Sequence, residues 1–97
     1  MAVESVLVES AKVWLRMTSD AFDGEIEQTI EACLLDLSNA GVRKLDTDDA
    51  VIQQAVKLYL KAQFGYNDAT DKFQQSYEHL KRALALSGDY ALEVDDA

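Results

Sequence analysis

The longest apolar pattern in the chain runs from Asp49 to Tyr66 and reads DAVIQQAVKLYLKAQFGY. Arranged on a helix, its apolar residues cover most of the circumference, whereas a surface helix is apolar along one stripe only. The polar side chains form a thin strip made of Gln53, Gln54, Lys57 and Lys61. We therefore expect a central helix that is enclosed by the other helices of the domain, or by them together with a neighbouring subunit.

Three further segments show the spacing of three and four residues that is typical of amphipathic helices. The first extends from about Ala2 to Arg16, the second follows the connection MTSDAFDG, and the last follows YNDAT. The apolar face of the second helix is expected to consist of Ile26, Ile30, Cys33, Leu34 and Leu37, and that of the last helix of Phe73, Tyr77, Leu80 and Leu84.

Residues with capping roles mark the ends of these helices. Short side chains that carry oxygen satisfy the free N–H groups at a helix N-terminus, and glycine readily adopts the left-handed conformation that often follows a C-terminus. The expected N-caps are, in chain order, Asp20 or Asp23, Asp46 or Thr47, and Asp68 or Thr70. The expected stops are Gly41, Gly65 and Gly88.

The chain is long enough for one domain with one core, which we place at residues 1–88. Residues 89–97 read DYALEVDDA, in which Tyr90, Leu92 and Val94 alternate with polar or small residues. This period of two suits an extended segment laid on another surface, although a frayed acidic tail is the competing interpretation. The predicted fold is all-α: a small four-helix domain with short loops and an extended acidic C-terminal tail.

The net charge of −9 is unevenly distributed along the chain. Residues 1–49 hold 11 acidic and 4 basic residues, residues 50–88 hold 3 and 5, and residues 89–97 hold 4 and none. Faces of opposite sign would favour head-to-tail self-association, unless the charges simply solvate helix faces. Strong affinity for nucleic acid is not expected, because neutralising phosphates needs a clustered basic patch.

Nothing in the pattern indicates a membrane span or a secretory signal. No apolar run approaches the roughly 20 residues that a helix needs to cross a bilayer. The opening MAVESVLVES lacks the basic flank and the cleavage site of a signal peptide. We therefore expect the protein in the cytosol, or in a particle that is assembled there.

No arrangement of residues predicts catalysis, a cofactor site or a metal site. Cys33, the single cysteine, lies in an apolar stripe and is expected to be a buried, unreactive thiol. His79, the single histidine, lies on the polar side of the last helix and is expected to be solvated. The run Asp46, Asp48 and Asp49 lacks the glycine and the closing glutamate of a calcium loop, so helix capping is the expected role.

Several side chains are candidates for contact with another subunit or partner. Tyr66 and Tyr90 lie just beyond helix ends, where an amphipathic ring can serve an interface. The expected interface residues are Arg16, Lys57, Leu58, Lys61, Tyr66, Tyr90 and Leu92. Trp14 and Phe73, by contrast, lie on apolar helix faces and are expected in the core.

Several phrases of the sequence resemble a known family. The opening helix ends in WLR, the acidic connection reads TSDAFD, and the second helix reads EIEQTIEACLLDL. The second half contains VKLYLKAQFGYND followed by KFQQSYEHLKRALALSGDY. From about Val6 to Tyr90 the chain resembles the small head-tail connector proteins of long-tailed phages, also called head-completion or DNA-packaging adaptor proteins.

The resemblance implies a structural protein of the virion without catalytic activity or cofactors. It implies an all-helical subunit that forms a ring beneath the portal, meets the portal protein and the next head-completion or tail protein, and extends the DNA channel at the head-tail junction. An acidic channel would repel the phosphates of passing DNA. Apart from the resemblance, an acidic helical adaptor or inhibitor module that binds a basic host protein remains the alternative.

Overall fold

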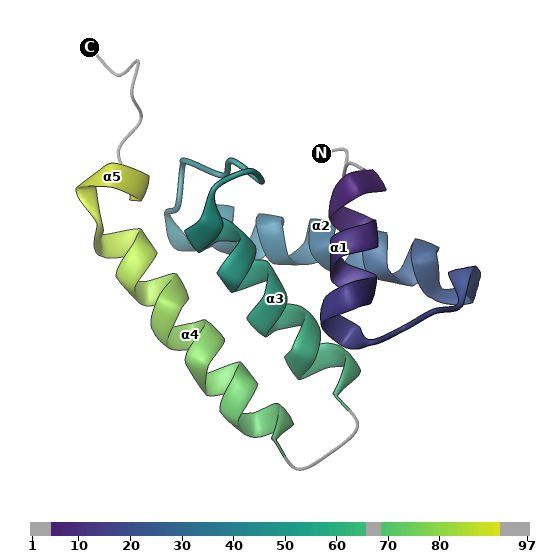
Figure 1. Cartoon of the computed structure of the whole chain (residues 1–97). Coiled ribbons are helices and arrows are strands. Elements are labelled where there is room, and N and C mark those ends of the chain that lie inside the picture. The colour runs from purple at the N-terminus through teal and green to yellow at the C-terminus, as the bar shows by residue number, and fades with distance from the viewer. Residues whose placement is uncertain (1–4, 66–68, 92–97) are drawn as a thin grey trace.

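The computed structural model describes residues 5–65 and 69–91, and this part of the chain is helical with no strand. Four long helices follow one another with short connections (Figure 1). A turn of 3-10 helix, η1, precedes the second, and a short helix, α5, follows the fourth. The elements are α1 (Ser5–Leu15), η1 (Asp20–Phe22), α2 (Asp23–Ala40), α3 (Ala50–Phe64), α4 (Thr70–Leu86) and α5 (Gly88–Ala91). The predicted all-α fold with four long helices is confirmed.

Helix α3 is the centre of the domain. It packs along its length against α4, which runs antiparallel to it, while α1 and α2 cover its other sides (Figure 1). Its residues Ile52, Ala55, Val56 and Leu60 are fully buried, whereas Leu58, Tyr59 and Phe64 are partly buried. The chain itself therefore covers α3 with three helices and leaves part of its apolar surface accessible.

Helix α2 supplies the largest share of the core, through the five residues that the spacing predicts. Ile26, Ile30, Cys33, Leu34 and Leu37 are all at most 1% exposed. Burying a side chain of the size of leucine or isoleucine stabilises a fold by about 1.5–3 kcal/mol. This apolar stripe accounts for the position of α2, which crosses behind α1 and α3 (Figure 1).

The N-terminus of α3 is capped by Asp49, so the prediction of Asp46 or Thr47 as its cap is wrong. The Asp49 carboxylate accepts hydrogen bonds from the backbone N–H groups of Val51 and Ile52, at 2.7 and 3.2 Å. Asp46 instead stabilises the turn before the helix, by accepting the N–H of Asp48 at 2.9 Å. The run of aspartates was thus correctly interpreted as a capping sequence, but the cap lies at its last member.

Neither Asp20 nor Asp23 caps α2, because both side chains bind a buried lysine. Lys12, only 6% exposed, forms ion pairs with Asp20 and with Asp23, the latter at 3.2 Å. These contacts tie the loop between α1 and α2 back onto α1. Ser19 caps η1 by accepting the N–H of Ala21 at 3.0 Å.

Two glycines end helices for different physical reasons. Gly41 follows α2 with φ of 110°, the left-handed conformation that the sequence predicts. Gly65 follows α3 with an extended backbone, so conformational freedom is not its role. A Cβ atom at Gly65 would lie 2.2 Å from the Thr70 side chain and 2.7 Å from the Lys61 carbonyl oxygen, so only glycine fits.

The two ends of α4 also differ from the prediction. Thr70 is the first residue of the helix, and its N-cap, Ala69, makes no side-chain capping bond, while Asp68 lies outside the described residues. The helix ends at Leu86, and Gly88 opens α5 instead of terminating α4.

The short helix α5 holds the first part of the expected tail against the domain. The backbone carbonyl of Tyr90 accepts N–H bonds from Arg43 and Lys44, at 2.7 and 3.0 Å. Asp89 and Tyr90 are therefore helical rather than extended. The rest of the expected tail, residues 92–97, lies outside the described residues.

Candidate functional site

Two of the expected interface residues, Arg16 and Lys61, line one pocket. It has a volume of about 400 Å³ and lies where the C-terminal ends of α1 and α3 meet the start of α4. We call it the Arg16–Lys61 pocket, and its lining consists of Trp14, Leu15, Arg16, Lys61, Phe64, Gly65 and Phe73. The expectation that Trp14 and Phe73 are core residues therefore needs correction, because both are only partly buried and form walls of this pocket.

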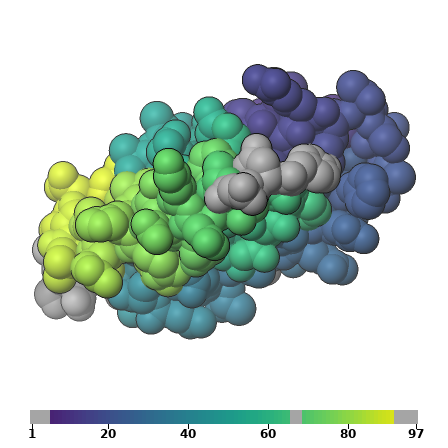
Figure 2. Space-filling view, turned by 90° about the horizontal axis from the view of Figure 1, so that it is seen from below, coloured from purple at the N-terminus to yellow at the C-terminus, as the bar shows by residue number. Residues whose placement is uncertain are grey.

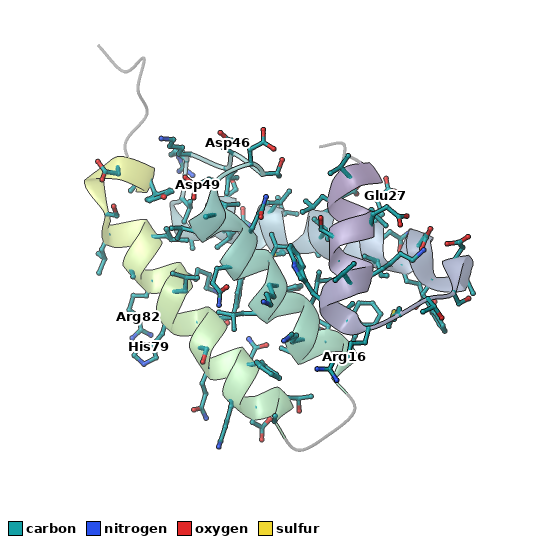
Figure 3. The ribbon with its side chains drawn as sticks, viewed as in Figure 1. Arg16, Glu27, Asp46, Asp49, His79 and Arg82 are labelled. Carbon is teal, nitrogen blue, oxygen red and sulfur yellow. The ribbon has the colours of Figure 1, made fainter. Side chains whose placement is uncertain are left out.

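The pocket combines positive charge with aromatic surface. The ammonium of Lys61 lies 5.4 Å from the centre of the Phe73 ring, within the range of a cation–π interaction. The guanidinium of Arg16 is exposed at the end of α1 (Figure 3). Within the described residues, neither cation pairs with a carboxylate. An occupant with carboxylates and apolar groups would suit such a site.

The backbone places Arg16 in an unusual conformation. Its φ is 58°, and it is the one described residue other than glycine with a positive φ. The left-handed region costs an ordinary L-residue roughly 1–2 kcal/mol. The turn is fixed by backbone bonds from the N–H of Arg16 to Val13 and from the N–H of Met17 to Lys12. A glycine would adopt this conformation at lower cost in backbone energy.

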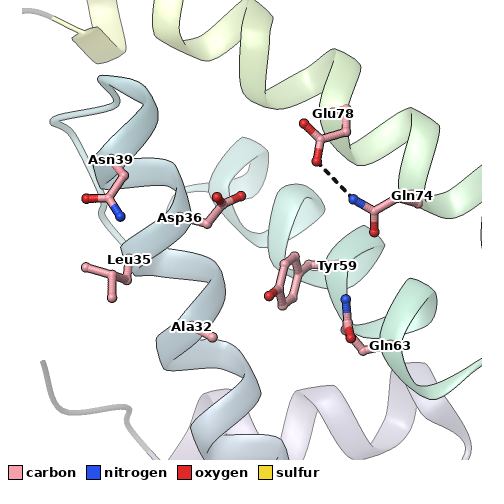
Figure 4. Close-up of a pocket in the computed structure, with 8 residues that line it drawn as sticks. All are labelled: Ala32, Leu35, Asp36, Asn39, Tyr59, Gln63, Gln74 and Glu78. Carbon is pink, nitrogen blue, oxygen red and sulfur yellow. Dashed lines mark hydrogen bonds between the residues drawn. The ribbon is translucent and has the colours of Figure 1, made fainter.

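A second pocket, of about 420 Å³, lies between α2, α3 and α4 (Figure 4). Its lining is mostly uncharged or acidic: Ala32, Leu35, Asp36, Asn39, Tyr59, Gln63, Gln74 and Glu78. At the rim of the pocket, Gln74 donates a hydrogen bond at 2.9 Å to Glu78, one turn further along α4 (Figure 4). Leu35 is 60% exposed at the edge of the pocket.

A chain of hydrogen bonds lies between this second pocket and the core. The buried Tyr77 hydroxyl accepts the thiol of Cys33 at 3.8 Å and donates to the Asp36 carboxylate at 2.7 Å. Lys81 donates to the same carboxylate at 2.9 Å. Burial opposes ionisation of Asp36, but the Tyr77 hydrogen bond and the Lys81 charge hold the pKa of Asp36 below its ordinary value.

Burial keeps the thiol and the phenol of this network protonated. Burial raises the pKa of Cys33 to about 12 and raises the pKa of Tyr77 further, so neither ionises near neutral pH. His79 is exposed on α4, where it lines an open hollow with Lys72, Gln75, Ser76, Leu80 and Ala83. Across residues 5–65 and 69–91, no group of three or more His, Cys, Asp or Glu side chains is placed to hold a metal ion.

Exposed acids gather near the start of α2, and exposed bases lie along the outer stripe of α4. The molecule measures 46 × 28 × 19 Å, with α4 and α5 at one end and the α1–η1–α2 connection at the other (Figure 2). Three exposed acids form what we call the acidic end: Asp20, Glu25 and Glu27. Three exposed residues on one stripe of α4 form what we call the basic face: Lys72, His79 and Arg82. In Figure 3, Glu27 and Arg82 lie on opposite sides of the molecule.

The basic face also carries apolar surface. Leu86, seven residues after His79, is 81% exposed. Glu78, on the same helix, turns toward Lys81 and pairs with it at 2.9 Å, so it does not neutralise the outer stripe. The face therefore has the mixture of cations and exposed apolar atoms that is common at protein interfaces.

The remaining expected interface residues lie in different places. Lys57 is half-buried on α3, and Leu58 is partly buried against the core. Tyr90 is bound to its own domain, since its hydroxyl donates to Asp49. Tyr66 and Leu92 lie outside the described residues. The structure thus brings Arg16 and Lys61 together and separates both from Tyr90, and the role of all seven in assembly stays a prediction.

The Arg16–Lys61 pocket, which forms where α1, α3 and α4 converge, was not predicted from the sequence. The signal available in the sequence was the strip Lys57 and Lys61 on an otherwise apolar helix, together with Trp14 beside Arg16. Spacing along single helices could not show that these groups share one cavity.

Comparison with known proteins identifies the family. The family model described as phage connector protein matches residues 7–91, which confirms the resemblance drawn from the sequence. No curated protein and no solved structure matches the chain. None of the helices in the described ranges combines the length and apolar character of a membrane span. Because the match covers most of its length, the chain belongs to the phage connector protein family, a family of structural components of the virion.

Proposed function

We propose that copies of this connector assemble head to tail into a ring that joins the portal of the DNA-filled head to the tail. The observation that carries the proposal is the separation of charge. Glu27 of the acidic end and Arg82 of the basic face lie on opposite sides of the subunit (Figure 3). Because the two surfaces differ, pairing one with the other on the next copy gives a heterologous interface, which closes into a ring when the rotation is suitable.

The accessible apolar surface supports the same arrangement. Leu86 beside the basic face and Val51 on α3, which is 38% exposed, remain accessible to a neighbour. A ring interface would cover such side chains, and the charges would select the orientation. The remaining exposed acids, among them Asp46 and Asp48, are available to line a channel through which DNA passes without sticking.

The test is a charge exchange across the proposed interface. Arg82→Glu and Glu27→Arg should each reduce ring formation on portal-containing heads, because each places like charges opposite one another. The double variant, which carries both changes in one chain, should recover part of the lost ring formation. Asp48→Arg is the control, since it changes an exposed charge away from both surfaces.

The measurements are electron microscopy of the heads and mass measurement of the purified protein. A chain that stays monomeric at high concentration and adds no ring to portal-containing heads would contradict the proposal. A stoichiometric complex of the purified protein with a basic host protein, in place of portal protein, would favour the adaptor or inhibitor alternative.

A further inference from the structure

Two cations and no acid are among the residues that line the Arg16–Lys61 pocket. Trp14 and Arg16 reach it from α1, Lys61 and Phe64 from α3, and Phe73 from α4. Three helices therefore fix its shape. Arg16 and Lys61 line the pocket together with the rings of Trp14, Phe64 and Phe73.

Arg16 provides a second and independent observation. Its left-handed backbone is a strained conformation for any residue except glycine. Such outliers concentrate where a side chain has a function. Here the strain places a guanidinium at the rim of a cavity with aromatic walls, which points to an anionic partner with apolar groups.

The chain itself contains a segment of that chemistry. Residues 92–97 read LEVDDA, so the acids Glu93, Asp95 and Asp96 accompany the apolar Leu92 and Val94. Carboxylates of this segment complement the two cations of the pocket, and its apolar side chains complement the rings. Since arginine binds carboxylates in a bidentate manner, Arg16 suits this partner well.

The pocket of the same subunit lies far from the point at which the segment begins. From Phe73, in the pocket, to Leu86 the helix α4 spans about 20 Å, and α5 lies beyond that end (Figure 1). Asp96 is five residues beyond Ala91 and can lie at most about 18 Å from it. Tyr90 is held at the far end by its bonds to Asp49 and to the Arg43 and Lys44 amides. A neighbouring copy can present these acids to the pocket without full extension of the segment.

We infer that residues 92–97 of one subunit dock in the Arg16–Lys61 pocket of a neighbouring subunit. The inference rests on the proposed head-to-tail assembly and adds a second, separate contact to it. Helix α5, after which the segment follows in the sequence, lies beyond the C-terminal end of α4 (Figure 1). Each subunit would then contact its neighbour twice, through residues 92–97 in the pocket and through the acidic end paired with the basic face.

Trp14 makes this contact measurable, because it lines the pocket and is the only tryptophan in the chain. The probe is a synthetic peptide with the sequence DYALEVDDA, added to the full-length protein at a concentration where the protein is monomeric. Trp14 emission is excited where tyrosine does not absorb. We expect a saturable change in the emission, which weakens with added salt because the contacts are ionic.

Variants separate this contact from the ring interface. Arg16→Glu and Lys61→Glu should each weaken binding of the peptide about tenfold, since each turns an attraction into a repulsion. A peptide with Gln and Asn in place of Glu93, Asp95 and Asp96 should also bind more weakly. Arg82→Glu makes the same change of charge on the basic face and should leave binding of the peptide unaltered.

Three results would overturn the inference. The first is peptide binding that persists at wild-type strength in both pocket variants. The second is no Trp14 response to the peptide at any concentration. The third is a short DNA oligonucleotide that changes Trp14 emission at lower concentration than the peptide does, which would assign the pocket to phosphates. If Arg82→Glu forms no rings but still binds the peptide, the docking site is supported and the ring proposal is not tested by that binding. If the wild-type protein forms rings but does not bind the peptide, the ring proposal is supported and the docking inference is wrong.

Discussion

The hydroxyl of Tyr90 donates to the carboxylate of Asp49, lying 3.1 and 3.0 Å from its two oxygens. The same carboxylate caps α3 through the N–H groups of Val51 and Ile52. One side chain thus starts the central helix and holds α5 in place. Lys44 adds to this contact, with its ammonium 6.0 Å from the centre of the Tyr90 ring.

Replacing Asp49 by alanine should destabilise the domain measurably. The change removes the α3 cap and leaves the Tyr90 hydroxyl without its acceptor. Loss of a cap alone corresponds to a fall of about 4–8 °C in the melting temperature of a domain of this size. Asp48→Ala is the matched control, because Asp48 is exposed and its side chain makes no bond within the described residues. Equal melting temperatures for the two variants would contradict the assigned cap.

The Asp49 contact should also make stability depend on pH. Burial opposes ionisation, but the Ile52 and Val51 amides and the Tyr90 hydroxyl keep the pKa of Asp49 below its ordinary value. A carboxyl whose pKa is lower in the folded state stabilises the fold above the unfolded pKa. That contribution disappears as pH falls through the folded pKa.

Asp49→Asn tests this dependence, because asparagine keeps a capping oxygen but does not titrate in this range. The wild-type protein should exceed the variant in melting temperature near about pH 7, and the difference should narrow toward about pH 3. A difference that stays constant over that range would mean that the charge of Asp49 contributes nothing to stability.

The bond between Tyr77 and Asp36 predicts a clear contrast between two tyrosines. Tyr77→Phe removes a buried donor to a carboxylate, so the free energy of unfolding should fall by about 1–2 kcal/mol. Tyr59→Phe should change it little, because the Tyr59 hydroxyl makes no hydrogen bond within the described residues, although its ring packs against Tyr77 at 5.0 Å. Denaturant titration of both variants gives the comparison, and a larger loss in Tyr59→Phe would contradict the assigned network.

Cys33 should be chemically silent in the native protein. It is fully buried, and burial raises the pKa of its thiol to about 12, so the reactive thiolate is nearly absent at neutral pH. A thiol reagent should therefore label Cys33 only as the protein unfolds. Labelling followed with and without denaturant tests this, and rapid labelling of the folded protein would show that α2 opens locally.

The sequence predicted those features that depend on one helix at a time. The stripe from Ile26 to Leu37 predicts the buried face of α2 correctly, because a face that repeats every three or four residues is typical of a helix packed on a core. The cap of α3 was misplaced because three aspartates compete within four positions, and hydrogen-bond geometry selects Asp49. The Arg16–Lys61 pocket was missed because it depends on how three helices cross, which no local pattern contains.

Arg16 allows backbone strain to be measured apart from side-chain function. Arg16→Ala and Arg16→Gly both remove the guanidinium, but only glycine relieves the left-handed backbone at φ of 58°. Glycine loses part of this gain through its greater freedom in the unfolded chain, so the glycine variant should be more stable than the alanine variant by about 1 kcal/mol. Denaturant titration measures the difference in the free energy of unfolding.

Both variants should bind the DYALEVDDA peptide more weakly than the wild-type protein does. Arg16→Gly should therefore gain stability relative to Arg16→Ala without regaining affinity for the peptide. Equal stability of the two variants would mean that the turn after α1 is not strained.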